Sequence, residues 1–238
     1  MRISVIVPAF NEERLLPETL RRLNAARGEL KCESELIVVD NASTDGTVEL
    51  ARFAGARVVT EVVKNIGAIR NAGAKASMGE IVAFFDADTF VPQNMLLAID
   101  SVMRDPKCLG GAVAVSYGKF ERPWLNFLSS AWRFWGGVFN MKQGAAQFSR
   151  RSAFDAIGGY DERIFLGEDI DFYWRLTRFA KEKGGTLSFI EEPQVITSTR
   201  RFDKMSVWDT MILTHPIYVL INWKRSRPWA KWYDGSVR

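Results

Sequence analysis

A pair of acidic residues follows an apolar run where two carboxylates could enter one cleft. Asp86-Ala87-Asp88 closes the run Ile81 to Phe85, so acids at positions i and i+2 leave the end of an expected strand. Carboxylate oxygens are hard ligands that hold Mg²⁺ or Mn²⁺ against a diphosphate. Acidic residues are also frequent in ordinary turns. The motif by itself therefore leaves both a metal site and a turn open.

The elements that would position this motif form an alternating pattern. Ligands of open parallel sheets bind beyond the carboxyl ends of the strands, and polar residues gather at each of these ends in the sequence. The pattern predicts an α/β fold with a mostly parallel central sheet flanked by helices. The expected strands are 3–7, 35–39, 57–62 and 81–85, and the expected helices are 12–25, 47–53 and 68–76.

Composition indicates one folded domain of 238 residues, with 47% hydrophobic and 25% charged residues, and it excludes a disordered chain. We expect residues 1–115 to form one half and residues 116–238 the other. Cys32 and Cys108 show no metal-ligand or disulfide spacing, which favours a cytoplasmic setting. The N-terminal residues are expected to form a core strand because no cleavage-site pattern follows them.

Tryptophan and positive charge concentrate in the second half. All eight tryptophans lie at or beyond Trp124. From Arg200 to the end, the sequence has eight Lys or Arg but three Asp and no Glu. The aromatic stretch 124–139 suits a core helix or a surface that faces an acceptor or a membrane. The basic tail suits phosphates, an anionic membrane or plain solvation, and nucleic acid is the least expected partner. Asp209, His215 and Pro216 interrupt the apolar segment 207–223 and disfavour a spanning helix.

Several blocks, taken together, resemble the inverting family 2 glycosyltransferases of GT-A fold. The nucleotide-binding blocks are residues 5–13, 38–47, 65–71 and 85–88, and the acceptor-side blocks are residues 144–148, 158–162 and 167–175. Their order and spacing also match, over about residues 3–201. The resemblance implies a Rossmann-like half that binds a nucleotide-sugar and a second half that binds the acceptor.

The resemblance implies roles for residues on the donor side. Pro8, Phe10 and Glu12 match the base-and-ribose loop, and Asp40 matches the acid that binds the base, where a carboxylate suits an imide N–H. Asn65, Gly67 and Arg70 match the loop and helix start under the nucleotide. Arg200 and Arg201 match a late basic segment that can close over the donor diphosphate. Ordinary alternatives are a strand-end acid for Asp40 and a surface cation for Arg70.

The resemblance also implies a metal site and a catalytic base. Asp88 and Asp86 match the metal-binding pair for Mn²⁺ or Mg²⁺, and His215, the only histidine, is a candidate third ligand. Asp169 matches the general base that takes the acceptor proton. Residues expected beside it on the acceptor side are Glu168, Asp171, Gln147 and Trp174. The ordinary alternative for the acids is a helix whose first turn is enriched in negative charge.

The implied activity is inverting, metal-dependent transfer of a sugar from a nucleotide-diphosphate donor, most commonly a UDP-sugar, to an acceptor hydroxyl or phosphate. The Trp-rich stretches and basic tail suit a polyprenyl phosphate or glycolipid acceptor and peripheral contact with the cytoplasmic face of a membrane. The chain lacks the Gln-x-x-Arg-Trp segment of the processive members. Two alternatives stay open: a non-catalytic nucleotide-sugar or membrane-binding module, and a sugar nucleotidyltransferase, although the latter's Gly-rich phosphate loop is missing.

Overall fold

One mixed sheet dominates the computed structural model, which describes residues 1–117, 144–199, 206, 208, 218 and 221–225. The strand order is β3-β2-β1-β4-β7-β6-β8-β5. Pairing is parallel from β3 to β4, antiparallel on both sides of β7, and parallel between β6 and β8. Its strands are β1 (Arg2–Ala9), β2 (Glu33–Asp40), β3 (Arg57–Thr60), β4 (Ile81–Phe85), β5 (Thr89–Phe90), β6 (Cys108–Tyr117), β7 (Ala146–Arg150) and β8 (Thr186–Thr197).

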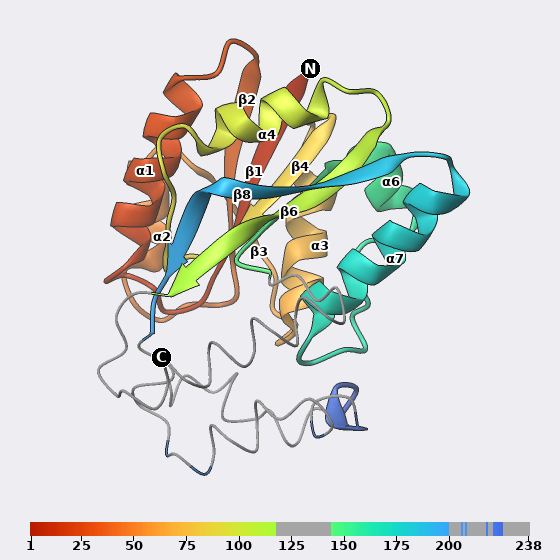
Figure 1. The fold of residues 1–238 in the computed structure, drawn as a ribbon. Coiled ribbons are helices and arrows are strands. Elements are labelled where there is room, and N and C mark those ends of the chain that lie inside the picture. The colour runs from red at the N-terminus through yellow and green to blue at the C-terminus, as the bar shows by residue number, and fades with distance from the viewer. Residues whose placement is uncertain (118–143, 200–205, 207, 209–217, 219–220, 226–238) are drawn as a thin grey trace.

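Helices cover both faces of the sheet, as expected (Figure 1). Alternate side chains of β1 enter two separate cores, because successive strand residues point to opposite faces. Val5 packs in the core with α1 and α4, whereas Ile6 packs with α3 and α7. The described helices are α1 (Leu16–Gly28), α2 (Thr47–Phe53), α3 (Ile66–Ala76), α4 (Met95–Met103), α6 (Arg151–Ala156) and α7 (Glu168–Glu182).

Several element boundaries differ from the sequence-based expectation for local reasons. Helix α1 begins at Leu16 and not at Glu12: the Leu15 and Leu16 N–H groups both donate to the Glu12 carbonyl in a turn, but Pro17 has no N–H with which to continue the ladder to Glu13. Helix α3 begins at Ile66, two residues early, because Asn65 caps it. Strand β3 ends at Thr60, before the expected 62. Helix α2 and strand β4 have the expected bounds.

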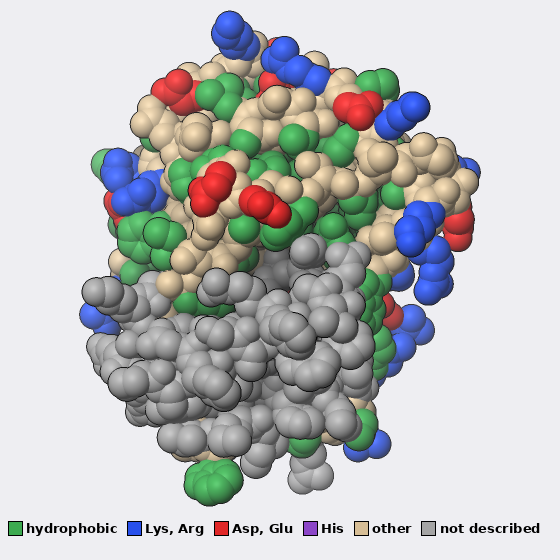
Figure 2. Space-filling model, viewed as in Figure 1, with side chains coloured by type: hydrophobic (Ala, Val, Ile, Leu, Met, Phe, Trp, Pro, Cys, Tyr) green, Lys and Arg blue, Asp and Glu red, His purple; other side chains and the backbone are tan. Residues whose placement is uncertain are grey.

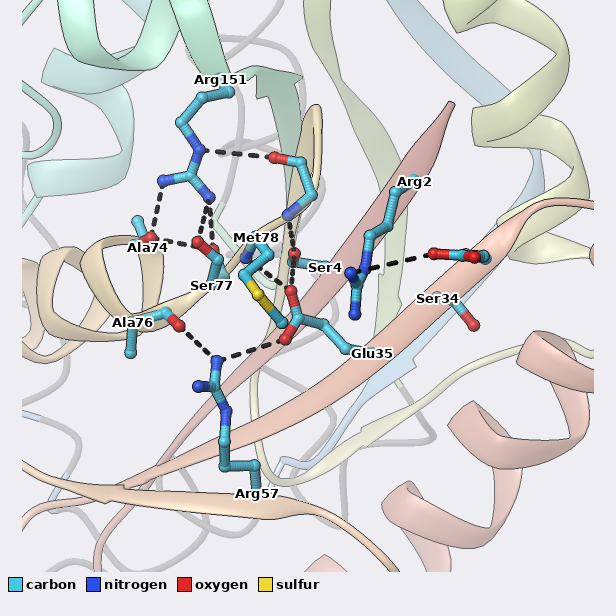
Figure 3. Close-up of polar contacts among 12 residues, drawn as sticks. Arg2, Ser4, Ser34, Glu35, Arg57, Ala74, Ala76, Ser77, Met78 and Arg151 are labelled. Atoms are coloured by element: carbon cyan, nitrogen blue, oxygen red, sulfur yellow. Dashed lines mark hydrogen bonds and ion pairs between the residues drawn. The ribbon is translucent and has the colours of Figure 1, made fainter.

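The C-terminal end of α3 is fixed by two arginines at the amino edge of the sheet (Figure 3). Arg57 donates to the Ala76 carbonyl and, at 3.2 Å, to Glu35. Arg151 donates to the Ala74 carbonyl at 2.6 Å. Cations at a helix C-terminus satisfy its free carbonyls and favour its dipole. These contacts anchor the C-terminal end of α3, and the N-terminal part of the helix, with Arg70, lies at the opposite, carboxyl edge of the sheet.

The sheet face formed by β8 is partly open. Figure 2 shows hydrophobic and acidic side chains in the middle of this face, and Lys and Arg mainly around its margin. On β8, Phe189 and Ile196 are 37% and 45% exposed. No helix of the described residues is long and apolar enough to cross a membrane. The aromatic stretch 124–139, and segment 207–223 apart from residues 208, 218 and 221–223, lie outside the described residues.

Candidate active site

Four segments that are distant in sequence meet at the carboxyl end of β4. Strand β7 runs antiparallel to β4 with Phe85 opposite Ala146, and the Asp86 N–H donates to the Ala145 carbonyl at 3.3 Å. Helix α3 contributes Arg70, and the start of α7 contributes Glu168 and Asp169. The fold therefore brings together the two acidic motifs that lie about 80 positions apart in the sequence.

Arg70 lies at the centre of this junction and is only 3% exposed. Its Nη1 donates to Glu168 Oε1 at 2.6 Å, and its Nη2 donates to Asp86 Oδ1 at 2.9 Å and to the Gly144 carbonyl at 3.4 Å. The guanidinium lies over the Tyr160 ring, 5.2 Å from its centroid. Burial lowers the pKa of Arg70, but the neighbouring acidic groups, Asp86 first, raise it above its ordinary value.

Asp86 and Asp88 occupy the loop between β4 and β5. The Asp86 side chain is 34% exposed, and only its Oδ1 is bonded by a described residue, Arg70. Asp88 is half-buried. The loop is fixed by Thr19 Oγ1, which donates to the Ala87 carbonyl at 2.8 Å, and by the Thr89 N–H, which donates to the Asp86 carbonyl at 3.2 Å. Two carboxylates on one restrained loop fit the oxygen preference of Mn²⁺ or Mg²⁺.

A complete set of metal ligands is not visible in the part of the chain that the structure describes. Within residues 1–117, 144–199 and the short later segments, no group of three or more His, Cys, Asp or Glu is arranged to hold a metal ion. His215, the candidate third ligand, lies outside these residues, as do Arg200 and Arg201. Their predicted roles stay predictions.

The expected base, Asp169, is oriented by backbone groups at the start of α7. Its Oδ2 accepts from the Gly144 N–H at 2.5 Å, and its Oδ1 accepts from the Ile170 N–H at 2.8 Å. Burial raises the pKa of Asp169, although Arg70 lowers it. Burial and the adjacent Asp169 raise the pKa of Glu168 to about 7, against the opposing effect of Arg70. Both groups therefore hold protons more tightly than exposed carboxyls.

Gln147 on β7 binds the backbone at the start of α7. Its Nε2 donates to the Asp169 carbonyl at 3.0 Å, and its Oε1 accepts from the Tyr160 hydroxyl at 3.0 Å. The Tyr160 ring stacks on Phe172 with centroids 4.4 Å apart. Sequence reasoning gave no role to Gly144 or Tyr160, although both stand in the quoted blocks. The signals that could have found them are a glycine two residues before β7 and an aromatic residue directly after Gly158-Gly159.

The other expected acceptor-side residues lie further along α7. Asp171 Oδ2 accepts from Arg175 Nε at 2.6 Å, and Arg175 Nη1 donates to the Ile157 and Gly159 carbonyls at 2.9 and 2.8 Å. This arrangement ties α7 to the turn that precedes Tyr160. Trp174 is half-buried. Asp171 is thus engaged in fixing the helix, apart from the junction around Arg70.

Residues expected to contact the nucleotide base line the carboxyl ends of β1 and β2. Pro8 is buried in β1 opposite Val39. Asp40 ends β2, is 4% exposed, and both of its carboxylate oxygens lie 3.3 Å from the Ser43 N–H. Phe10 is half-buried and Glu12 is 5% exposed. These residues form an adjacent group along the rim, next to the β4 junction.

Asn65 and Gly67, expected under the nucleotide, are in contact with other protein groups. The Asn65 Oδ1 accepts from the Ala68 N–H at 3.0 Å, and its Nδ2 donates to the Glu162 and Ile164 carbonyls at 2.9 Å each. A Cβ on Gly67 would lie 3.2 Å from the Tyr160 Cβ. The close approach that this glycine permits is therefore toward Tyr160. Asn65 joins the start of α3 to the segment 162–164.

Solved structures share this fold. S. aureus TarS 1-349 in complex with UDP-GlcNAc is similar with a TM-score of 0.63 and 22% identity, over 84% of this chain and 59% of that chain. The mannosyltransferase PcManGT from Pyrobaculum calidifontis, in complex with GDP-Man and Mn²⁺, is similar with a TM-score of 0.61 and 24% identity, over 82% of this chain and 56% of that chain. These likenesses confirm the predicted GT-A type fold.

Sequence relatives and a family model agree with the fold. The undecaprenyl-phosphate 4-deoxy-4-formamido-L-arabinose transferase of Pseudomonas fluorescens is 38% identical over 93 residues, 36% of this chain and 27% of that protein, so the match spans about a quarter of its length. Glycosyltransferase AglE of Haloferax volcanii is 27% identical over 80% of this chain and 64% of its own length. The model of glycosyl transferase family 2 matches residues 4–158, more than half of the chain. The chain therefore belongs to glycosyl transferase family 2, as its motifs predicted.

Proposed function

We propose that this glycosyltransferase moves a sugar from a nucleotide-diphosphate donor to an acceptor hydroxyl or phosphate, with inversion at the anomeric carbon. The observation that carries the proposal is the junction at the end of β4. There, Arg70 joins the metal-binding candidate Asp86 to the acidic pair Glu168 and Asp169. Donor-side and acceptor-side groups are thus within one hydrogen-bonded network at the rim where α/β sheets bind ligands.

Asp169 acts in this proposal as the general base. A single displacement requires a carboxylate near the attacking hydroxyl, on the sugar face opposite the departing diphosphate. The Gly144 and Ile170 N–H groups hold the two oxygens of Asp169 in a fixed orientation. Its raised pKa increases its affinity for the acceptor proton. Where the acceptor is a phosphate, which is already ionised, Asp169 positions it instead.

Asp88 and Asp86 are the described residues that would hold Mn²⁺ or Mg²⁺, with His215 as a further proposed ligand. Bound there, the cation would neutralise the diphosphate leaving group. The complex of PcManGT with GDP-Man and Mn²⁺ supports this assignment by similarity of fold. Arg200 and Arg201 are proposed to pair with the diphosphate, a task that suits the planar guanidinium.

A UDP-sugar is the proposed donor class. Asp40 ends β2 next to the base-and-ribose residues, and its carboxylate suits the N–H of an imide base. The complex of TarS with UDP-GlcNAc supports this choice, whereas the complex of PcManGT with GDP-Man makes a GDP-sugar the first alternative to test.

A lipid-linked acceptor, such as a polyprenyl phosphate or a glycolipid, is the proposed second substrate. The name of the Pseudomonas relative includes undecaprenyl phosphate, which supports this class. Trp208 and Ile221 are 75% and 63% exposed, and such apolar side chains suit the boundary of a bilayer. We therefore propose peripheral contact with the cytoplasmic face of a membrane.

The test is a transfer assay with purified protein, Mn²⁺, radiolabelled UDP- and GDP-sugars, and undecaprenyl phosphate or a soluble sugar as acceptor. Wild type is expected to form product whose anomeric configuration, read by NMR, is inverted. With a hydroxyl acceptor, Asp169→Asn should lower kcat by ~10²- to 10⁴-fold, the range for general base catalysis. Asp155→Asn, on an exposed residue of α6, is the matched control. Nucleotide binding with no transfer to any acceptor would favour the non-catalytic module.

A further inference from the structure

Arg70 contacts acids from both sides of the site, although the sequence placed it among the donor-binding residues. We infer that Arg70 is a positioning residue, which fixes Asp86 for metal binding and links it to the acids at the start of α7. The inference rests on the proposed function, since that function gives Asp86 and Asp169 their roles. It differs from the expected role because Arg70 then acts through other protein groups and touches no substrate.

The burial of Arg70 argues against direct contact with the donor. Its guanidinium is 3% exposed, with Nη1 and Nη2 both bonded to carboxylates and the Tyr160 ring below it. The remaining Nε is buried and has no hydrogen-bond partner. A donor phosphate could reach the guanidinium only by displacing a carboxylate, and that displaced charge would be left unpaired.

The planar shape of the guanidinium explains why an arginine stands here. Its two terminal nitrogens reach carboxylates on different elements, Asp86 after β4 and Glu168 on α7. The same Nη2 also approaches the Gly144 carbonyl, and the Gly144 N–H holds Asp169. Contacts therefore run without interruption from the metal-binding loop to the expected base. A lysine carries the same charge, but its single nitrogen lacks the rigid fork that spans both partners.

The contact on Asp86 has a direct consequence for metal binding. Arg70 occupies Oδ1, and no described residue donates to Oδ2, which is left as the ligand atom on a side chain that is 34% exposed. Hydrogen-bond partners of this kind orient metal ligands, and their loss typically weakens metal binding by ~10- to 100-fold.

Two variants test the inference without changing the net charge of the cluster. Arg70→Lys keeps the positive charge but removes the fork, and the double variant Arg70→Met/Glu168→Gln removes one charge of each sign. The double variant leaves no unpaired buried charge from this pair, so it keeps the test available if Arg70→Lys fails to fold by circular dichroism. Binding of Mn²⁺ alone is measured from the EPR signal of the free ion at pH 8, above the pKa of Glu168.

Both variants should bind Mn²⁺ ~10- to 100-fold more weakly than wild type. The control Arg104→Lys alters another arginine paired with an aspartate, Asp100, and should bind as wild type does. Arg104 lies near the opposite end of β4, because Arg150 pairs with Ile81 there and donates to the adjoining Met103 carbonyl.

Calorimetry of UDP and GDP in EDTA separates the inferred role from direct donor contact. Metal-free nucleotide affinity should equal that of wild type in both Arg70 variants. A loss of metal-free nucleotide affinity as large as the loss of Mn²⁺ affinity would overturn the inference. Mn²⁺ affinity equal to wild type would also overturn it while leaving the proposed function intact. If wild type itself bound no Mn²⁺, the proposed metal-dependent function would fail together with the inference.

Discussion

Replacing Gly144 with alanine should displace Asp169 without changing any charge. A Cβ built on Gly144 lies 2.5 Å from the Asp169 Cβ and 2.9 Å from its Oδ2. Ordinary contacts between carbon atoms lie at about 3.5–4.0 Å, so the Asp169 side chain must move by roughly 1 Å. Gly144 is not among the glycines with positive φ, so alanine adds no backbone strain.

The expected loss of activity follows from that displacement. A misplacement of ~1 Å costs about 10²-fold in rate, which corresponds to about 2.7 kcal/mol of transition-state stabilisation. The inserted methyl group should also lower the free energy of unfolding by about 1–3 kcal/mol, the usual cost of overpacking. Metal-free nucleotide affinity should stay unchanged, because Gly144 contacts Asp169, which is proposed to act on the acceptor.

Steady-state transfer with the donor and acceptor of the wild-type assay measures this effect, and urea denaturation measures stability. Gly28→Ala is the control, because a Cβ at Gly28 meets no atom within 4 Å and should leave the rate unchanged. Wild-type transfer by folded Gly144→Ala, or an equal loss of activity in Gly28→Ala, would contradict this role of Gly144.

Three further predictions concern stability and membrane contact. The folded Glu168 holds its proton up to a pKa of about 7, above the ordinary 4.5, so wild type should lose up to roughly 3 kcal/mol of unfolding free energy as pH rises through this window. Glu168→Gln should flatten that slope in urea denaturation, and an unchanged slope would contradict the assignment. Asn65→Ala removes the α3 cap and two buried donors, and should cost about 2–3 kcal/mol by the same measurement; a loss below about 0.5 kcal/mol would count against its joining role. Wild type should sediment with anionic lipid vesicles and Trp208→Ala should do so less, whereas wild type that stays in the supernatant would contradict membrane contact.

The sequence was informative where structure is local. Continuous apolar runs such as Ile81 to Phe85 predict buried parallel strands, and the structure has them at the expected positions. Helix starts were less accurate, since the turn at Glu12 and the cap by Asn65 depend on hydrogen bonds that the apolar pattern does not specify.

Long-range pairing was the part that sequence reasoning missed. Strand β7 lies between β4 and β6, and β6 pairs with β8, which begins about 70 residues after β6 ends. No turn signal marks such pairings. The same limit explains Arg70. Its position in the sequence suggested a surface or donor-binding cation, and only the folded structure reveals its two carboxylate partners, Asp86 after β4 and Glu168 on α7.

Mn²⁺-dependent nucleotide binding is the decisive property of the proposed transferase. Calorimetry and thermal shift with UDP, GDP, dTDP and CDP, with and without Mn²⁺, would be compared for wild type, Asp88→Ala and the exposed control Asp155→Ala. One nucleotide should stabilise wild type and Asp155→Ala in a Mn²⁺-dependent way, and Asp88→Ala should lose this stabilisation. Absence of binding by any of the four nucleotides to wild type would contradict the proposed function.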